Sequence, residues 1–174
     1  MPVTFDNPLS GERITIRRPA AGADPLSWEL TLAPGGAVPS RHAHPGQSER
    51  FTVLSGQLRL RVGRRRPVRL GPGQSALVPP GTVHHFANPA AVPAVVAVDT
   101  TPAGAMADLL EVAAAMARRQ HAEGRRRPRL LDLALFMDRF AAEVRAPYLP
   151  VVLVRAVVRP AAWLARRTGR RLPR

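Results

Sequence analysis

The sequence predicts a mainly β protein, an antiparallel sandwich or barrel, followed by a small α-helical C-terminal region. Its 174 residues include 19 prolines and 13 glycines, a content that favours short strands joined by turns over a bundle of long helices. The pattern also changes near Pro102, because short alternating or β-branched runs precede it and helix-forming runs follow it. We therefore expect a β-barrel domain at residues 1–102 and a helical extension at residues 103–174.

Turn residues divide the first part of the chain into seven short runs that we expect to be strands. Alternation is clearest in the fourth run, where leucine and valine alternate with arginine, so that one face would be buried and the other wet. Many short strands at regular spacing are typical of an antiparallel sandwich or barrel. The expected strands are Arg13–Arg17, Ser27–Leu32, Phe51–Leu54, Leu58–Val62, Ala76–Val78, Val83–Phe86 and Val95–Val98.

The second part of the chain predicts helices. Ala105–Gln120 is rich in helix-forming residues, and Leu130–Val144 places apolar residues at helical spacing. Val151–Val158 predicts either a short third helix or a strand, because its residues are largely β-branched. A further short segment, Ala161–Arg167, follows Pro160.

The composition excludes several kinds of site. The chain has no cysteine, which rules out disulfides, zinc fingers and thiol nucleophiles and leaves histidine and carboxylate as metal ligands. Its formal net charge is +14, and every basic residue is arginine. Because the sequence shows neither a helix-turn-helix pattern nor an aromatic and basic face, we expect no nucleic-acid partner.

The first twenty residues contain no apolar core of the kind that a signal peptide needs. The chain also has no run of about 18 uncharged apolar residues that would suit a membrane-spanning helix. We therefore expect a cytoplasmic location.

Four of the five histidines fall in two tight groups within the β-rich part. His42 and His44 are two residues apart, so on an extended segment their side chains point the same way. Glu49 follows after a turn, and His84 comes from the second group, whereas its neighbour His85 would face the opposite side. Three imidazoles and one carboxylate suit a divalent transition metal, with iron, manganese, nickel, zinc and copper all open.

The residues around these ligands form two spaced motifs. The first is Gly36, five residues, His42-Ala43-His44, four residues, Glu49, six residues and Gly56; the second is Gly73, five residues, Pro79-Pro80-Gly81, two residues, His84, three residues and Asn88. Both resemble the two conserved motifs of the cupin superfamily at every expected position, in the right order, with a short hairpin between them. The resemblance covers about residues 28–100.

This resemblance implies a small single-domain, RmlC-like cupin, that is, a jelly-roll barrel of antiparallel strands with a metal inside. His42, His44, Glu49 and His84 match the metal ligands of the family one by one, and Asn88 matches its closing asparagine. The helical tail is not part of the common cupin pattern, and it faintly resembles the tails of small bacterial cupin proteins.

Strand alternation also predicts an apolar pocket beside the four ligands. If Glu49 points inward, Phe51 does too, and if His84 points inward, Phe86 follows. With Trp28 on a neighbouring strand, these aromatic side chains are candidates for substrate binding, since small-molecule sites are mostly apolar. The alternative is that they only fill the barrel.

The pattern favours a metal-dependent enzyme, dioxygenase- or isomerase-like, that acts on a small organic molecule, with Glu49 as a catalytic residue that passes a proton. The alternative is a non-catalytic, small-molecule-binding or sensing cupin whose basic amphipathic tail contacts a partner or a membrane surface. The tail supports the second idea because residues 103–174 carry a net charge of +9. Membrane contact would involve residues 125–167, but packing on the barrel or dimerisation is the favoured explanation of their apolar side chains. Outward Thr52 and Leu54 would permit a homodimer.

Overall fold

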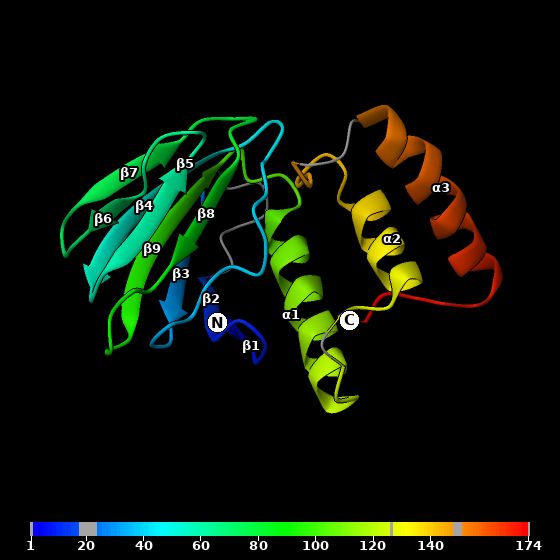
Figure 1. The fold of residues 1–174 in the computed structure, drawn as a ribbon, viewed down its shortest axis with the longest axis horizontal. Coiled ribbons are helices and arrows are strands. Elements are labelled where there is room, and N and C mark those ends of the chain that lie inside the picture. Colours follow the sequence, from blue (N-terminus) through cyan, green and yellow to red (C-terminus); the bar gives the residue numbers. More distant parts are fainter. Residues whose placement is uncertain (1, 18–23, 126, 148–150, 174) are drawn as a thin grey trace.

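The computed structural model describes residues 2–17, 24–125, 127–147 and 151–173, which form two β-sheets and three helices (Figure 1). The strands are β1 (Pro2–Asn7), β2 (Glu12–Arg17), β3 (Leu26–Leu32), β4 (Ser48–Ser55), β5 (Leu58–Val62), β6 (Val68–Leu70), β7 (Ser75–Val78), β8 (His84–Ala87) and β9 (Ala94–Thr101). The helices are α1 (Met106–Ala122), α2 (Leu130–Arg139) and α3 (Val151–Arg167). The fold is therefore mainly β with a helical C-terminal region, as predicted.

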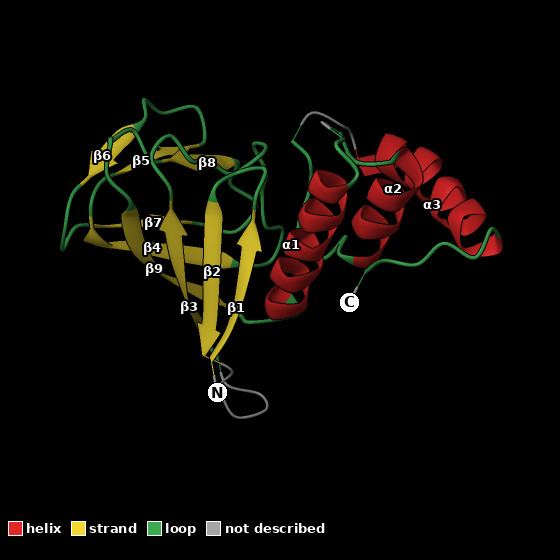
Figure 2. Ribbon diagram, turned by 90° about the horizontal axis from the view of Figure 1, so that it is seen from below, coloured by secondary structure: helices red, strands yellow, loops and turns green. Residues whose placement is uncertain are grey.

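The two sheets face each other across a common core. The larger sheet has the strand order β1-β2-β3-β9-β4-β7 and the smaller has the order β6-β5-β8, with all neighbours antiparallel. Figure 2 shows the smaller sheet over one side of the larger one. Leu58, Leu60 and Phe86 of the smaller sheet join Val53 and Val96 of the larger sheet in one buried cluster.

Strict alternation explains why these segments form strands. Along β3, Leu26, Trp28, Leu30 and Leu32 are buried, and the residues between them are exposed or half-buried. A one-residue shift would turn this whole apolar set toward water, so the register with β2 and β9 is strongly specified.

A tight crossing near Gly56 needs glycine. Its φ is +74°, and a Cβ atom there would lie 2.5 Å from the carbonyl oxygen of Pro93 and 2.8 Å from the Cα of Ala94. Both the left-handed backbone and the close approach of β9 therefore exclude a side chain at this position.

Two strands were not predicted from the sequence. β1 contains Pro2, Asp6 and Asn7, which have low strand propensity, but it pairs along its whole length with β2 and buries Phe5 beside Ile14. β6 has only three residues and is paired with β5 across the hairpin that includes Arg64–Arg66. In both cases the partner strand, and not the local sequence, determines the structure.

The helices differ from expectation at their ends. α2 ends at Arg139 instead of Val144, because the following chain leaves the helix and Arg145 pairs with Ala43. α3 is one continuous helix that contains Pro160, although proline removes a backbone donor from a helix. The buried side chains of Val158 and Ala162 on either side of Pro160 pack with α2, and this packing favours the uninterrupted helix.

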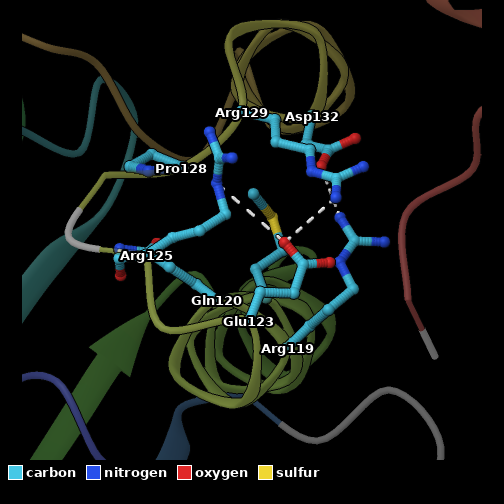
Figure 3. A pocket seen from close by; sticks show the side chains of 8 residues that line it. Arg119, Gln120, Glu123, Arg125, Pro128, Arg129 and Asp132 are labelled. Atoms are coloured by element: carbon cyan, nitrogen blue, oxygen red, sulfur yellow. Dashed lines mark hydrogen bonds and ion pairs between the residues drawn. The ribbon is translucent and has the colours of Figure 1, made fainter.

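Helix α1 lies between the sheets and the other two helices (Figures 1 and 2). Its buried face belongs to the main core, whereas α2 and α3 share a smaller cluster. Asp132 of α2 is only 3 % exposed. It links α2 to α1 and to the C-terminal segment, because it forms ion pairs with Arg119 of α1 at 2.5 Å and with Arg170 at 3.3 Å. Figure 3 shows the Arg119 pair together with Glu123 and its arginine neighbours, in a narrow gap between α1 and the start of α2. Among the helices that the structure describes, none has the length and apolar character needed to cross a bilayer.

Candidate metal centre

Backbone pairing brings the two histidine groups together. His42 and His84 form an isolated antiparallel bridge, in which His84 N donates to the His42 carbonyl at 2.8 Å and His42 N donates to the His84 carbonyl at 3.2 Å. Nearby, Gly81 N donates to the His44 carbonyl at 2.7 Å. The two imidazole rings of the bridge have centroids 4.3 Å apart, and His44 lies 5.0 Å from His42 and 5.3 Å from His84.

Glu49 completes the cluster from β4, where it pairs with Val78 on one side and Thr100 on the other. Its Oε2 atom lies 3.0 Å from His84 Nε2 and 3.3 Å from His44 Nε2. One ligand atom from each of His42, His44, Glu49 and His84 lies within 4.8 Å of all the others. We refer to these four residues as the His/Glu cluster.

Hydrogen bonds at the outer ring nitrogens determine which way the imidazole lone pairs point. The Nδ1 atoms of His42, His44 and His84 lie 3.0, 2.6 and 3.2 Å from the carbonyl oxygens of Ser40, Glu143 and Thr82. Because a carbonyl oxygen can only accept, each Nδ1 carries the hydrogen, and each neutral ring presents an Nε2 lone pair. The same outer-shell arrangement orients histidine ligands in metal sites.

The inner atoms have no ordinary donor and acceptor pairing. His44 Nε2, His84 Nε2 and Glu49 Oε2 are buried and make no regular hydrogen bond within the described residues, although they lie close together. Electron-pair donors that converge in this way repel one another unless a cation or extra protons lie between them. The donor set and its convergence therefore fit a divalent transition metal.

The electrostatics of the His/Glu cluster point the same way. Burial, together with the neighbouring imidazoles, lowers the pKa of His42 to about 3. Burial alone would raise the pKa of Glu49, but His44 and His84 outweigh it and hold that pKa well below its usual range. Burial likewise opposes the charged form of His44, yet Glu49 raises its pKa overall. The carboxylate of Glu49 thus stays negative and favours a proton on His44, and a metal ion bound by the four residues would displace that proton.

The helical region contributes directly to the His/Glu cluster, which the sequence did not predict. The chain after α2 pairs with the His42–His44 segment, as Arg145 N donates to the Ala43 carbonyl at 2.8 Å and Ala43 N donates to the Arg145 carbonyl at 3.1 Å. The Glu143 carbonyl in this segment is the partner of His44 Nδ1. Backbone carbonyls carry no residue signature, so no pattern in the sequence could have identified this contact.

An open cavity of about 600 Å³ adjoins the cluster. His42, His44 and Glu49 lie in its wall, and so do Trp28 and Phe86. Trp28 Nε1 donates to Thr100 Oγ1 at 3.1 Å, which satisfies the polar edge of the indole inside the protein.

Phe51 occupies a different place from the other two aromatic candidates. It is fully buried and is not part of the cavity wall, and its ring centroid lies 5.5 Å from that of Phe86 and 6.1 Å from that of His84. Phe51 therefore lies behind Phe86 and supports it. Direct contact of Trp28 and Phe86 with a substrate stays a prediction.

The opposite wall of the cavity is helical. It includes Met106, Leu109 and Ala113 of α1 and Phe136 of α2. From the sequence the helical tail is expected to be an appendage, because the periodicity of a helix shows that one face is apolar but not what that face covers.

Two polar residues near the cavity were also missed. Gln47 is buried, and its Nε2 donates to the carbonyls of Pro102 and Ala103 at 3.0 Å each, which fixes the start of α1 beside the cluster. Glu12 is buried in the cavity wall on β2. A sequence signal for Glu12 existed, since it shares the inward parity of Ile14 and Ile16.

Comparisons with known proteins agree with this architecture. A family model described as "Cupin domain" matches residues 28–100. An RmlC-like cupin from Shewanella frigidimarina is 19 % identical, with 60 % of this chain and 86 % of that chain covered and a TM-score of 0.50, a likeness that concerns the fold. A cupin-superfamily sugar phosphate isomerase from Silicibacter pomeroyi is 26 % identical over 58 % of this chain and 68 % of that one, with a TM-score of 0.48. The Thermus thermophilus protein TT1209 is 27 % identical over 58 % and 83 %, with a TM-score of 0.42. No curated protein matches the sequence.

Proposed function

Because this chain belongs to the cupin superfamily and carries the His/Glu cluster, we propose that it is a metal-dependent enzyme that acts on a small organic molecule. The metal would be a divalent transition metal held by His42, His44, Glu49 and His84. The observation that carries the proposal is that three imidazoles, whose outer Nδ1 atoms are already hydrogen-bonded, converge on one carboxylate with their Nε2 atoms.

A metal held by these residues would supply Lewis-acid or redox chemistry, as in dioxygenase- or isomerase-like reactions. Four protein ligands leave room for a substrate oxygen on the side of the cluster that faces the cavity. Trp28 and Phe86 would hold the apolar part of the substrate there and exclude water.

Glu49 is the proposed catalytic carboxylate, because its Oε2 lies at the inner edge of the cluster within 3.3 Å of two imidazole nitrogens. The low pKa of Glu49 keeps it ionised, so in the resting cluster it can accept a proton from a substrate but cannot donate one, and the same low pKa makes it a weak base.

Elemental analysis of the protein purified without added metal tests the metal centre. We expect close to one transition-metal ion per chain in the wild type and its loss in His84→Ala and Glu49→Ala. The matched control is His85→Ala, since His85 is the next residue on β8 but lies outside the cluster. A folded wild-type protein that stays empty when iron, manganese, nickel, zinc and copper are offered in turn would contradict the proposal.

The alternative function is a non-catalytic cupin that binds a small molecule and reports it through the helices. The observation that favours it is the contribution of α1 and α2 to the cavity wall, which would let a bound molecule alter the helical region. A wild type that holds metal and binds apolar probes but turns over no oxidisable or isomerisable compound would support this alternative. Protease sensitivity of residues 103–174 that changes on binding would support it further.

The remaining proposals concern the domain boundaries, the location of the protein and its surface contacts. We propose a cupin domain at residues 1–102 and a helical extension at 103–174, a cytoplasmic location, and contact of residues 125–167 with a partner or an anionic membrane surface. A homodimer through the outward side of β4, where Leu54 is 50 % exposed, is a further expectation. Sedimentation of the purified protein, alone and with anionic vesicles, tests the last two.

A further inference from the structure

The cavity has a second polar end at Glu12, for which the proposed metal chemistry has no use. Glu12 is 8 % exposed and lines the cavity from the inward side of β2. A carboxyl group buried among apolar side chains is costly unless its oxygens are hydrogen-bonded. The Glu12 carboxyl therefore needs hydrogen-bond donors, either from the protein itself or from a bound ligand.

The hydrogen bonds of Glu12 favour a binding site. Ser10 Oγ donates to Oε2 at 2.5 Å, and Asn7 Nδ2 donates to the same oxygen at 3.0 Å. Across the described part of the chain both hydrogen bonds of this carboxyl end on Oε2, which leaves Oε1 to accept from a donor in the cavity. The loop that holds these residues is itself fixed, because Ala33 N donates to the Gly11 carbonyl at 2.9 Å.

The sheet register gives the distance between the two polar ends. Glu49 pairs with Thr100, which pairs with Leu26 at one end of β3, whereas Glu12 pairs with Leu32 at the other end. With six residue steps from Leu26 to Leu32, the backbone positions of Glu49 and Glu12 are about 20 Å apart in the direction of the strands.

Helix α1 gives a second, independent measure. Its first residue, Met106, lies at the cluster end, where Gln47 binds the two carbonyls that precede the helix. Ala117 lies at the other end, next to Arg118, which reaches the Asp6 carbonyl at 3.4 Å beside the Glu12 loop. From Met106 to Ala117 a helix rises about 17 Å, in agreement with the sheet. Both residues line the cavity, so the cavity extends along this whole length.

The walls between the two ends are apolar. Ile14 and Trp28 come from the large sheet, Leu109 and Ala113 from α1, and Phe136 from α2. We propose that the cavity binds an elongated, mostly apolar molecule with an oxygen-bearing group at the His/Glu cluster and a hydroxyl or amino group that donates a hydrogen bond to Glu12. Burial raises the pKa of Glu12, and the hydrogen bonds from Ser10 and Asn7 offset only part of this effect. A hydrogen-bond donor of the ligand at Oε1 would therefore stabilise the carboxyl further.

This inference rests on the proposed metal centre for the first end of the ligand only, because the Glu12 end is built from different residues. Its test uses the full chain loaded with the metal found by elemental analysis, and titration calorimetry below the micelle concentration of each probe. The long probes are hexadecanoate, 16-hydroxyhexadecanoate and 16-aminohexadecanoate, whose extended length matches the span. The short probes are octanoate and 8-hydroxyoctanoate.

In the wild type, we expect the terminal hydroxyl or amino group to tighten binding of the long probe at least about threefold, since it reaches Glu12. In the short probe the hydroxyl would end among apolar side chains, so it should weaken binding. Glu12→Gln should weaken 16-aminohexadecanoate about tenfold, because the charge-assisted hydrogen bond is lost, and should change hexadecanoate less than about twofold. Glu29→Gln, on the exposed side of β3, is the matched control and should change none of these affinities.

The inference is overturned if the terminal polar groups weaken the long and short probes alike in the wild type. This comparison needs no variant, so it decides the matter even if Glu12→Gln does not fold. Metal content measured on the same samples separates the two proposals. A protein that binds metal but shows no preference for the terminal group refutes the Glu12 end alone, whereas a protein without metal that keeps the preference refutes the metal centre alone.

Discussion

Helices α1 and α3 each have 17 residues, yet they stand in opposite relations to the rest of the molecule. Six side chains of α1 are buried, several of them in the main core, and others line the cavity beside the His/Glu cluster. In the described part of α3, Val158, Ala162 and Ala165 are buried, but only against a small cluster on α2, while Val157 and Trp163 are more than half exposed. Length and apolar content thus do not determine whether a helix belongs to the site. The surface that the helix covers does.

The largest effect of a substitution is expected in the segment between α2 and the His/Glu cluster. Phe140 is 1 % exposed, packs in the main core and precedes Glu143. We expect Phe140→Ala to lower the free energy of unfolding by about 3–5 kcal/mol, measured by denaturant titration. The metal affinity should also fall about tenfold or more, because the Glu143 carbonyl would no longer hold His44. Unchanged metal affinity in a folded variant would show that this contact does not tune the cluster.

A leucine in each helix provides a matched pair. Leu109 on α1 is 7 % exposed, and Leu164 on α3 is 48 % exposed. Leu109→Ala should cost about 2–5 kcal/mol of unfolding free energy, whereas Leu164→Ala should stay within about 0.5 kcal/mol of the wild type. Equal losses would mean that α3 is covered in solution, and sedimentation would then identify a dimer.

A larger side chain in the cavity tests the role of α1 in binding. Ala113 lines the cavity and is half-buried, so Ala113→Phe has room to fold while it fills part of the binding volume. We expect the affinity for 16-hydroxyhexadecanoate to drop about tenfold or more, that is, by about 1.4 kcal/mol. Metal content should not change, and Ala156→Phe on the exposed side of α3 should leave both quantities unaltered.

The meeting of the four residues of the His/Glu cluster could be predicted from the sequence, because the spacing within each motif is short and each position has a local structural reason. His42, His44 and His84 meet through one backbone bridge, and Glu49 follows the alternation of β4. The β3 and β5 alternation likewise gave strands within one residue of those observed.

What the sequence could not show is how distant segments meet. The placement of α1 over the cavity, the Glu143 contact and the strand β1 all depend on pairing between residues far apart in the chain. Phe51 and Phe86 share the predicted inward direction, but only the packing of the layers puts one on the cavity wall and the other behind it. Local periodicity gives the face of an element and not its neighbour.

The pH dependence of the unfolding free energy tests whether the Glu12 carboxyl is buried in the folded protein. Because burial raises the pKa of Glu12 above its ordinary value of 4.5, the folded protein favours the protonated carboxyl, and wild-type stability falls as the pH rises above about 4.5. Glu12→Gln cannot titrate. The unfolding free energy of Glu12→Gln minus that of the wild type should therefore increase from pH 4.5 to pH 7.5, as measured by urea titration at each pH. A difference that stays constant across this range would show that folding does not raise the pKa of Glu12.

The smallest expected effect concerns the exposed face of α3. Trp163 is 56 % exposed, and the Arg167 guanidinium lies 5.0 Å from its ring centroid. Trp163→Ala should leave unfolding free energy and metal content unchanged within error. It should reduce co-sedimentation with anionic vesicles if this face meets a membrane. Equal sedimentation of wild type and variant would remove membrane contact through Trp163.

The hydrogen bond between His44 Nδ1 and the Glu143 carbonyl joins residues 99 positions apart, and this has a consequence for synthesis of the protein. A ribosome completes both cupin motifs long before it reaches residue 143, so a nascent chain holds all four ligand residues while one of them still lacks its orienting partner. The final geometry of the cluster therefore arises only when the segment after α2 has left the ribosome and docked. A metal ion bound before that point would meet a cluster in which His44 lacks its hydrogen bond to the Glu143 carbonyl, so complete loading of the proposed metal centre would follow synthesis of residue 143.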